Sequence, residues 1–494
     1  MTPKTDIQPS PWSSLRRWGP IGVGIALSAV ALSFVACGDE EAGGAQDPND
    51  LARLEQVLET NADIAFAMYS DSVIEAEALA DAIDQLVRDP SQATLDAARE
   101  AWLVAREPYG LTEVYRFRAS PIDDTNYDPS DGEDGPEGDI NAWPLGEGLI
   151  DYVVTGDDFG ADQIGVSDHE TGVSAPIPEN NIINSPGITI DADLLSRSAT
   201  AEDERDVIAG YHAIEFLLWG QDLTSDGGAD GRDSTPGQRP FTDFVTDGTC
   251  TSGSTENTDS TFCERRGQYL QVAAAKLVAD LRSVRDAWAE GASYRTAFTQ
   301  VDDLAAGKRK LLEILTGMGT LSEGELAGER MQIALSANSQ EDEHSCFADN
   351  THRDIWLNAE GISNLYRGDY AGYDSDLDGA PDVTTNAVQG YGIDDYLRDL
   401  GRDALADDIE AAFATTETNY RAIDALARSG TPVDLQIIDP QSSDARPMRD
   451  TILSLNAQAS QIARIATELD LGSPADVVDP DASECDTTDP TTEC

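Results

Sequence analysis

The chain has 494 residues, of which 40% are hydrophobic, and a formal net charge of -61. The hydrophobic content is enough for folded cores and excludes a chain that is disordered throughout, and the length predicts two or three domains. The negative charge excludes nucleic acid as a favoured partner and attracts cations. Most of the carboxylates are expected only to keep the protein soluble.

The N-terminal segment has the features of an export signal. Two arginines precede an uncharged apolar run, Ile21 to Val35, which is too short for an ordinary membrane span. The run ends in Phe34-Val35-Ala36-Cys37, and small residues before a lone cysteine resemble a lipobox. We therefore predict a lipoprotein signal peptide over residues 1–36, lipidation of Cys37, a polar tether over 37–49 and a cell-envelope location, periplasmic or on the outer surface. An ordinary signal peptide cleaved nearby is the alternative.

Helical periodicity dominates the rest of the chain. From Leu51 onward, apolar residues recur at the steps of one helix face until Asp89-Pro90, and Ser91 can cap a second helix that runs to about Phe117. Strand signals are few and short, so the predicted fold class is all-α, with two helical-bundle domains joined by long Asp/Gly-rich loops. Further helices are expected at about 203–219, 264–290, 294–317, 323–345, 350–366, 402–428 and 447–469.

A long polar loop over residues 222–262 is the best candidate for a domain boundary. Cys250 and Cys263 flank its Ser/Thr/Gly-rich part and are predicted to form a disulfide. The predicted organisation is a first bundle at 50–245, a stapled linker at 246–262, a second bundle at 263–471 and an acidic disordered tail at 472–494.

The other three cysteines give two further expectations. Cys485 and Cys494 lie in the tail and are a second candidate pair. These pairings leave Cys346 without a disulfide partner, so it is expected to be a buried free thiol. None of the spacings is a zinc-binding CxxC pattern.

The sharpest local signal is Gly210-Tyr211-His212-Ala213-Ile214-Glu215. On a helix, His212 and Glu215 are three residues apart and share a face, so an imidazole nitrogen and a carboxylate can meet one cation. This donor pair suits iron, zinc or manganese. The apolar neighbours make a charged Glu215 costly unless it is paired or bound to a metal. An isolated His-x-x-Glu, however, is more often a surface pair than a ligand set.

A second segment carries the same residue types in reverse order. Glu341 and His344 are three apart, His352 follows, and Glu343 lies between them. The chain has four histidines, and three of them fall in these two carboxylate-rich segments. Because bundle proteins hold metals with Glu-x-x-His pairs on facing helices, both segments are predicted to contribute to one site. The alternative is that the acidic residues form a solvated helix face.

A third segment, Ala105 to Gly110, is predicted to be helical and contains Pro108, which should kink the helix. Glu107 beside this proline either faces a ligand or pairs with Arg106 or Arg116.

Several of these segments together resemble the imelysin-like proteins, most closely the iron-regulated protein A type. The resemblance covers about residues 50–470. It implies two helical bundles with a functional site at their interface, export to the periplasm or cell surface, and a part in iron uptake; the family is also catalogued as metallopeptidases. The segments that carry it are Ala105 to Gly110, Arg116 to Arg118, Ile140 to Leu145, Gly210 to Glu215, Gly237 to Asp243, Gly328 to Met331 and Gln340 to Arg353.

One Asp-rich insertion resembles the start of an EF-hand-type calcium loop. It places Asp374, Asp376, Asp378 and Asp382 at close spacing, but Thr385 stands where such a loop has its bidentate acid. A structural calcium is one expectation here, and a plain acidic turn is the other.

These observations favour a metal-binding lipoprotein, linked to iron, over an enzyme. A hydrolytic zinc site needs three protein ligands, an open position and a general base, and the chain has no HExxH motif. His344 or His352 could complete a His-x-x-Glu zinc site with Glu343 or Glu107 as the base, so a metallopeptidase is the alternative. A third possible function is that of a scaffold protein with a vestigial metal site. No membrane span follows Val35, so any role in uptake requires partner proteins, the iron-uptake components.

Overall fold

The computed structural model describes residues 49–118, 120–126, 134–153, 181–196, 207–224, 232–252, 260–479 and 482–494. The predictions for the signal peptide, Cys37 and most of the tether therefore lie outside the described residues. Almost all of the regular structure is helical, which confirms the predicted all-α class. Among the described residues, none of the helices has the combined length and apolar character to cross a bilayer.

The long helices carry the predicted periodic patterns. The α-helices are α1 (Asp50–Arg88), α2 (Gln92–Gly110), α3 (Glu137–Ile140), α4 (Glu147–Ile150), α5 (Ala192–Leu195), α6 (Gly210–Trp219), α7 (Ser260–Trp288), α8 (Ser293–Thr299), α9 (Leu304–Thr320), α10 (Ile333–Ala337), α11 (Thr351–Arg367), α12 (Ile393–Asp399), α13 (Asp403–Arg428), α14 (Val433–Gln436) and α15 (Arg446–Glu468). The other elements are the 3-10 helices η2 (Leu111–Tyr115), η6 (Phe241–Phe244) and η8 (Pro474–Asp476), the π-helix η7 (Leu321–Gln332), and an antiparallel pair of short strands, β1 (Asp369–Tyr370) and β2 (Val388–Gln389).

The ends of two helices follow from local chemistry. Ser91 caps α2 as predicted, and its hydroxyl accepts a hydrogen bond from the backbone N–H of Thr94. The helical run through α9, η7 and α10 stops at Ala337, because Asn338 takes the left-handed conformation that ends a helix. The predicted helix over 323–345 is therefore too long, and Glu341 and His344 lie on turns rather than on one helix face.

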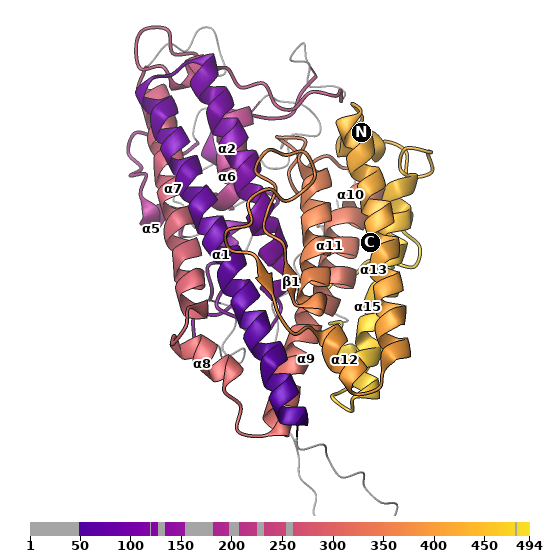
Figure 1. Cartoon of the computed structure of the whole chain (residues 1–494). Coiled ribbons are helices and arrows are strands. Elements are labelled where there is room, and N and C mark those ends of the chain that lie inside the picture. The colour runs from indigo at the N-terminus through magenta and orange to yellow at the C-terminus, as the bar shows by residue number, and fades with distance from the viewer. Residues whose placement is uncertain are drawn as a thin grey trace, which may run out of the picture. The chain divides into compact units, whose positions relative to one another are not determined.

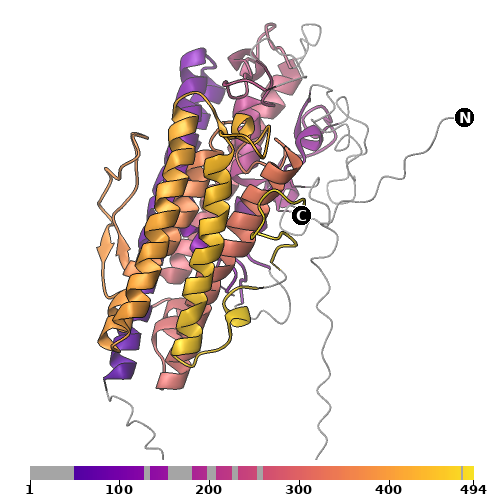
Figure 2. The same ribbon diagram turned by 90° about the vertical axis from the view of Figure 1, so that its right-hand side faces the viewer.

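The helices of Leu51–Cys494 pack as two neighbouring groups (Figure 1). One group contains α2, α6 and α7, with α6 against both of the others. In the other, α13 packs along α15, and α15 packs on α9 and η7; Figure 2 shows α13 and α15 running side by side. Helix α11 contacts both groups, since it touches α2 and η2 as well as α13 and η7.

Two glycines allow the close approach of α11 to the first group. A Cβ at Gly110 would lie 2.8 Å from Cβ of Leu357, and a Cβ at Gly361 would lie 2.5 Å from the carbonyl oxygen of Leu111. Both distances are shorter than real carbon contacts, so larger side chains would force the helices apart. This contact places the N-terminal half of α11 beside the end of α2.

The predicted linker at 246–262 does not separate the helices before it from α7. Helix α7 packs against α6, and its Arg266 forms a buried ion pair with Asp151, which Arg239 also contacts at 2.7 Å. The limits of the two predicted domains stay a prediction, but α7 lies with the N-terminal group. The Cys250–Cys263 disulfide is formed, as the sequence predicts.

The C-terminal segment, for which the sequence predicts disorder, packs on the protein over its described residues. Val477 is fully buried, and Asn456 on α15 donates a 2.7 Å hydrogen bond to Thr487. The amino-acid composition of the tail does not predict that it is ordered, because a few contacts and a short disulfide-closed loop are enough to fix a polar segment. Cys485 and Cys494 form that loop as a disulfide, and Cys346 is a free cysteine.

Candidate functional site

Helix α6 places His212 and Glu215 in the protein interior. The helix begins at Gly210 with a φ of 82°, and a Cβ there would lie 2.4 Å from the carbonyl oxygen of Ile140, so the position requires glycine. His212 is 2% exposed and Glu215 is fully buried. His212 Nδ1 lies 3.0 Å from Glu215 Oε2, and Glu215 Oε1 accepts a hydrogen bond from the backbone N–H of Ala348.

His344 meets this pair from the second segment. The imidazole rings of His212 and His344 lie 4.6 Å apart, centroid to centroid, at an interplanar angle of 72°. His344 is also buried, and the edge of its ring meets that of Trp143 at 4.6 Å. The structure therefore brings His212, Glu215 and His344 into one site, although His344 reaches it from a turn and not from a helix.

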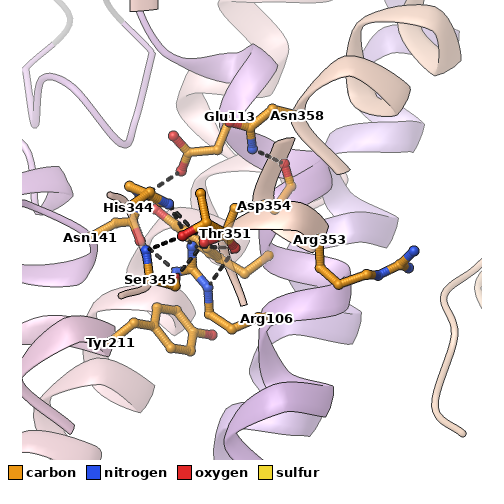
Figure 3. Close-up of polar contacts among 12 residues, drawn as sticks. Arg106, Glu113, Asn141, Tyr211, His344, Ser345, Thr351, Arg353, Asp354 and Asn358 are labelled. Atoms are coloured by element: carbon orange, nitrogen blue, oxygen red, sulfur yellow. Dashed lines mark hydrogen bonds and ion pairs between the residues drawn. The ribbon is translucent and has the colours of Figure 1, made fainter. Parts of the chain in front are cut away.

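A buried ion pair holds His344 in place. His344 Nδ1 lies 2.9 Å from Asp354 Oδ2, and Arg106 Nη2 donates to Asp354 Oδ1 at 2.9 Å. Arg106 Nη1 donates to the side-chain oxygen of Asn141 at 2.5 Å, and Asn141 Nδ2 is 3.3 Å from His344 Nε2. Ser345 donates a further hydrogen bond to Asp354. These side chains gather where α2, α11 and the turn before α11 meet (Figure 3).

A second ion pair lies directly behind Asn141. Arg330 on η7 donates to Glu113 Oε2 at 2.7 Å and to Glu325 at 2.8 Å, and its guanidinium lies over the ring of Trp143. Asn141 Nδ2 reaches Glu113 Oε1 at 3.4 Å. The two ion pairs thus form one continuous buried network that ends at the imidazole of His344.

The network sets the protonation of the site. Burial raises the cost of charging an imidazole, and the nearby Arg330 adds to it, so the pKa of His344 falls to about 4. Burial, with His344 and Arg106 beside it, lowers the pKa of His212 well below its usual value. Burial also raises the pKa of Glu215, with Asp354 adding to the effect. Both imidazoles are therefore neutral at neutral pH, the state in which they can act as ligands.

His212 carries the donor atom that the site leaves free. Its Nε2 is buried and has no hydrogen-bond partner among the described residues. A buried polar atom without a partner costs free energy, and native proteins rarely keep one without a reason. Neutral His344 lies beside His212, and Glu215 holds its other ring nitrogen, as carboxylates commonly do for histidines that bind metals. A free imidazole nitrogen of this kind suits iron, zinc or manganese.

The other residues predicted for this site have different neighbours. His352 Nε2 lies 3.5 Å from Asp424, and its Nδ1 lies 3.0 Å from the carbonyl oxygen of Asp349. Glu341 lies close enough to Cys346 to add to the effect of burial in raising the pKa of that thiol. The sequence places both residues near His344, but the contacts of His352 lead to Asp349 and Asp424.

The two candidate general bases also lie elsewhere. Glu107 accepts two hydrogen bonds from Arg353, at 2.8 and 2.6 Å, rather than pairing with Arg106 or Arg116, and Figure 3 shows Arg353 pointing away from His344. Glu343 is 2% exposed, and its Oε1 has no hydrogen-bond partner among the described residues. Burial and the neighbouring carboxylate of Asp434 raise its pKa well above the usual value.

The Asp-rich loop forms a compact acidic cluster. One carboxylate oxygen from each of Asp374, Asp376 and Asp378 lies within 4.8 Å of the others. Asp374 is buried and accepts a 2.6 Å hydrogen bond from the backbone N–H of Gly379. Asp382 instead accepts hydrogen bonds from Ser375, across the base of the loop.

The network contains five residues that the sequence did not single out for the site. Arg106, Asn141 and Arg330 lie in segments that carry the family resemblance, so their occurrence there was the available signal, whereas Glu113 and Asp354 lie just outside those segments. Their individual roles depend on contacts between distant parts of the chain. They are Arg106, Glu113, Asn141, Arg330 and Asp354.

Comparisons with known proteins agree with this architecture. The family model of imelysin, a peptidase family, matches residues 65–462. The fold is similar to the crystal structure of a protein described as an iron-regulated protein A precursor from Parabacteroides distasonis, with a TM-score of 0.55, 15% sequence identity, and coverage of 86% of this chain and 97% of that one. An imelysin-like protein from Psychrobacter arcticum gives a TM-score of 0.47 at 16% identity, with coverage of 84% and 94%. No curated protein matches the chain.

Proposed function

The chain belongs to the imelysin family, and on that premise we propose that it binds a metal ion, linked to iron, through His212, Glu215 and His344. The proposal also keeps the envelope location: an exported lipoprotein, anchored through Cys37, that works with iron-uptake components. Glu341 and His352 are the further ligands that the sequence suggests, and their contribution is part of what must be tested.

The observation that carries the proposal is the free Nε2 of His212. It is buried beside a second neutral imidazole and a carboxylate, and it has no hydrogen-bond partner among the described residues. When Nδ1–H donates to ionised Glu215, Nε2 carries a lone pair, and a metal ion bound there would remove the cost of leaving it unpaired. His344 would have to release Asn141 before its own Nε2 could bind the same ion.

The charges around the site support a cation ligand. Asp354 forms an ion pair with Arg106, and Glu113 forms one with Arg330, so both carboxylate charges are balanced. Among the described residues, Glu215 pairs with no arginine or lysine and its side-chain partner is the neutral imidazole of His212, and burial raises its pKa. Burial favours the neutral form of this carboxyl, and a metal ion bound at the histidines would favour its ionised form instead.

A zinc metallopeptidase is the alternative function. It is supported by the name of the family and by the presence of a His-x-x-Glu pair with a distant histidine. It is disfavoured because a hydrolytic site needs an open position and a base. His212 and His344 are both buried, and Glu107 is held by Arg353.

Calcium at the Asp-rich loop is a separate, structural part of the proposal. The clustering of Asp374, Asp376 and Asp378 supports it, since calcium prefers several oxygen ligands in flexible loops. Asp382, bonded to Ser375, would have to release that residue to become a ligand.

A binding titration of the metal-free protein tests the main proposal. Ferrous, ferric and zinc ions are each added to wild-type protein and to His344→Ala, and the heat of binding is measured. The proposal requires a site in the wild-type protein that is lost or strongly weakened in the variant. Incubating the same preparations with an unfolded protein substrate tests the alternative, because zinc-dependent cleavage that is lost in His344→Ala would favour the peptidase.

A further inference from the structure

A second group of buried carboxylates lies on the other side of the turn that carries His344. Asp434, on the short helix α14, is 1% exposed, and neither of its carboxylate oxygens has a hydrogen-bond partner among the described residues. Glu343 is 2% exposed, and its Oε1 is likewise unpartnered. Each such oxygen has lost its water without gaining a donor, which is costly for a carboxyl group in either protonation state.

Two further acidic residues, Asp222 and Asp349, add negative charge near this pair. Asp222, which follows α6, is 4% exposed and accepts a hydrogen bond from Gln340 at the start of the turn. Burial and the negative charges of Asp349 and Asp434 raise the pKa of Asp222 to about 9. Burial and the charge of Asp434 likewise raise the pKa of Asp349 to about 8. Hydrogen bonds connect these acidic residues to one turn: Gln340 binds Asp222, and Arg232 joins the backbone of Asp434 to that of Asn338.

Among the described residues, Arg232 is the cation whose charge acts on this group, and its hydrogen bonds go elsewhere. Arg232 donates to the side-chain oxygen of Asn338 at 3.0 Å and to the backbone carbonyl oxygens of Asn338 and Asp434. Its charge is felt by Asp434 and Glu343, but its described hydrogen bonds go to none of the carboxylates. One guanidinium therefore opposes a larger number of buried acidic groups.

We propose that Asp222, Glu343, Asp349 and Asp434 form a calcium-binding site that ties the turn over residues 338–350 to α14 and to the end of α6. Oxygen is the only donor type in the group, which suits a hard cation and not a transition metal. Calcium fits better than magnesium because the donors come from three separate segments, and calcium tolerates irregular geometry and ligand water.

Binding requires the carboxylates to move together. Among the described residues, only Asp374, Asp376 and Asp378 bring three such ligand atoms within 4.8 Å of one another. The second group is wider, so a cation would have to draw its side chains together, displace their protons and take water as further ligands. Because Glu343 precedes His344, this closure would also fix the turn that presents His344 to His212. The proposal does not depend on metal binding at His212.

Calcium titration of the purified protein tests the proposal, with Asp434→Asn as the main variant. Bound calcium is counted by equilibrium dialysis against calcium chloride, and thermal unfolding is followed with calcium and with EDTA. Asp376→Asn is the matched control for the Asp-rich loop, and His212→Ala is the control for the histidine site. We expect Asp434→Asn to bind one calcium ion fewer than the wild-type protein, while His212→Ala binds as many and Asp376→Asn keeps the ion that Asp434→Asn loses.

The stability of the variant separates a lost site from a damaged fold. In EDTA, Asp434→Asn should be at least as stable as the wild-type protein, since the substitution relieves repulsion; in calcium, it should show a smaller rise in melting temperature. Equal calcium counts in the wild-type protein and Asp434→Asn would overturn the proposal. So would a loss of stability in EDTA, because Asp434 would then stabilise the fold without an ion.

Discussion

The imidazole rings of His212 and His344 lie 4.6 Å apart in the protein interior. One ring comes from α6 and the other from the turn before α11, and each has a carboxylate at Nδ1, Glu215 for His212 and Asp354 for His344. The two carboxylates differ in whether a cationic side chain balances their negative charge. Asp354 also pairs with Arg106, whereas Glu215 accepts a backbone hydrogen bond from Ala348 and, within the described part of the chain, pairs with no guanidinium. This asymmetry underlies the predictions that follow.

Glu215→Gln should weaken metal binding without unfolding the protein. The side-chain oxygen of glutamine can still accept the hydrogen bond from Ala348, but it offers the metal no negative charge. The raised pKa of Glu215 means that this group favours the folded state below pH 4.5, its usual pKa, and that the advantage is lost as pH rises. At neutral pH the metal-free variant should therefore be as stable as the wild-type protein, or more stable. Urea unfolding with and without a chelator measures this, and a large loss of stability at pH 7 would contradict it.

Asp354→Asn should destabilise the protein strongly. It leaves the buried guanidinium of Arg106 without its counter-ion, a change that typically costs about 3–5 kcal/mol. Asp286→Asn is the control, because Asp286 pairs with Arg285 at the surface and is 66% exposed; such pairs contribute about 1 kcal/mol or less. Both variants are compared with the wild-type protein by urea unfolding at pH 7. Equal effects would show that the Arg106–Asp354 pair does not hold the fold together.

Because His344 is buried, the metal-free protein should lose stability as pH falls from about 6.5 to about 4. The folded protein keeps this imidazole neutral down to its pKa of about 4, while in the unfolded chain it gains a proton near pH 6.5. The unfolded state thus binds more protons in this window, and the loss is on the order of 3 kcal/mol. His212 acts in the same direction, and Glu215 opposes both.

The contribution of His344 is isolated by comparing the wild-type protein with His344→Gln across this pH range. The variant should show a shallower fall in the free energy of unfolding toward pH 4. Parallel curves for the two proteins would mean that His344 titrates normally in the folded state.

Cys37→Ser tests the predicted lipid anchor. If Cys37 is the attachment site, the variant should leave the membrane fraction or accumulate as an unprocessed precursor, because the short apolar run before it cannot hold the mature protein. Fractionation of cells followed by immunoblotting measures both outcomes. A variant that is processed normally and stays in the membrane fraction would exclude lipidation at Cys37.

Helix positions and fold class were predictable from the sequence because burial repeats along each helix. Leu54, Leu58 and Met68, all apolar positions of the expected first helix, are fully buried in α1. The all-α class and the family follow from such patterns together with the motif segments. The end of α10 was not predictable in this way, because Asn338 stops the helix through its left-handed backbone while the acidic residues after it still fit a helical spacing.

The candidate site was predictable only in part. The spacing of His212 and Glu215 predicted their contact, since both lie on one helix. The partners of Arg106, Glu107 and His352 depend on how α2, α11 and α13 pack, and periodicity carries no information about pairing between helices. Sequence reasoning therefore found the histidines and missed the ion pairs that fix them.

Metal analysis of the purified protein tests the central claim most directly. Wild-type protein, His212→Ala and, as the control, a variant of the fourth histidine outside the two motif segments, His169→Ala, are purified identically. Iron, zinc and manganese are measured by mass spectrometry after reloading with each ion and removal of the excess. We predict that the wild-type protein and His169→Ala retain the same ion in equal amounts per chain and that His212→Ala retains none. Equal metal content in His212→Ala and the wild-type protein would contradict a metal site at His212.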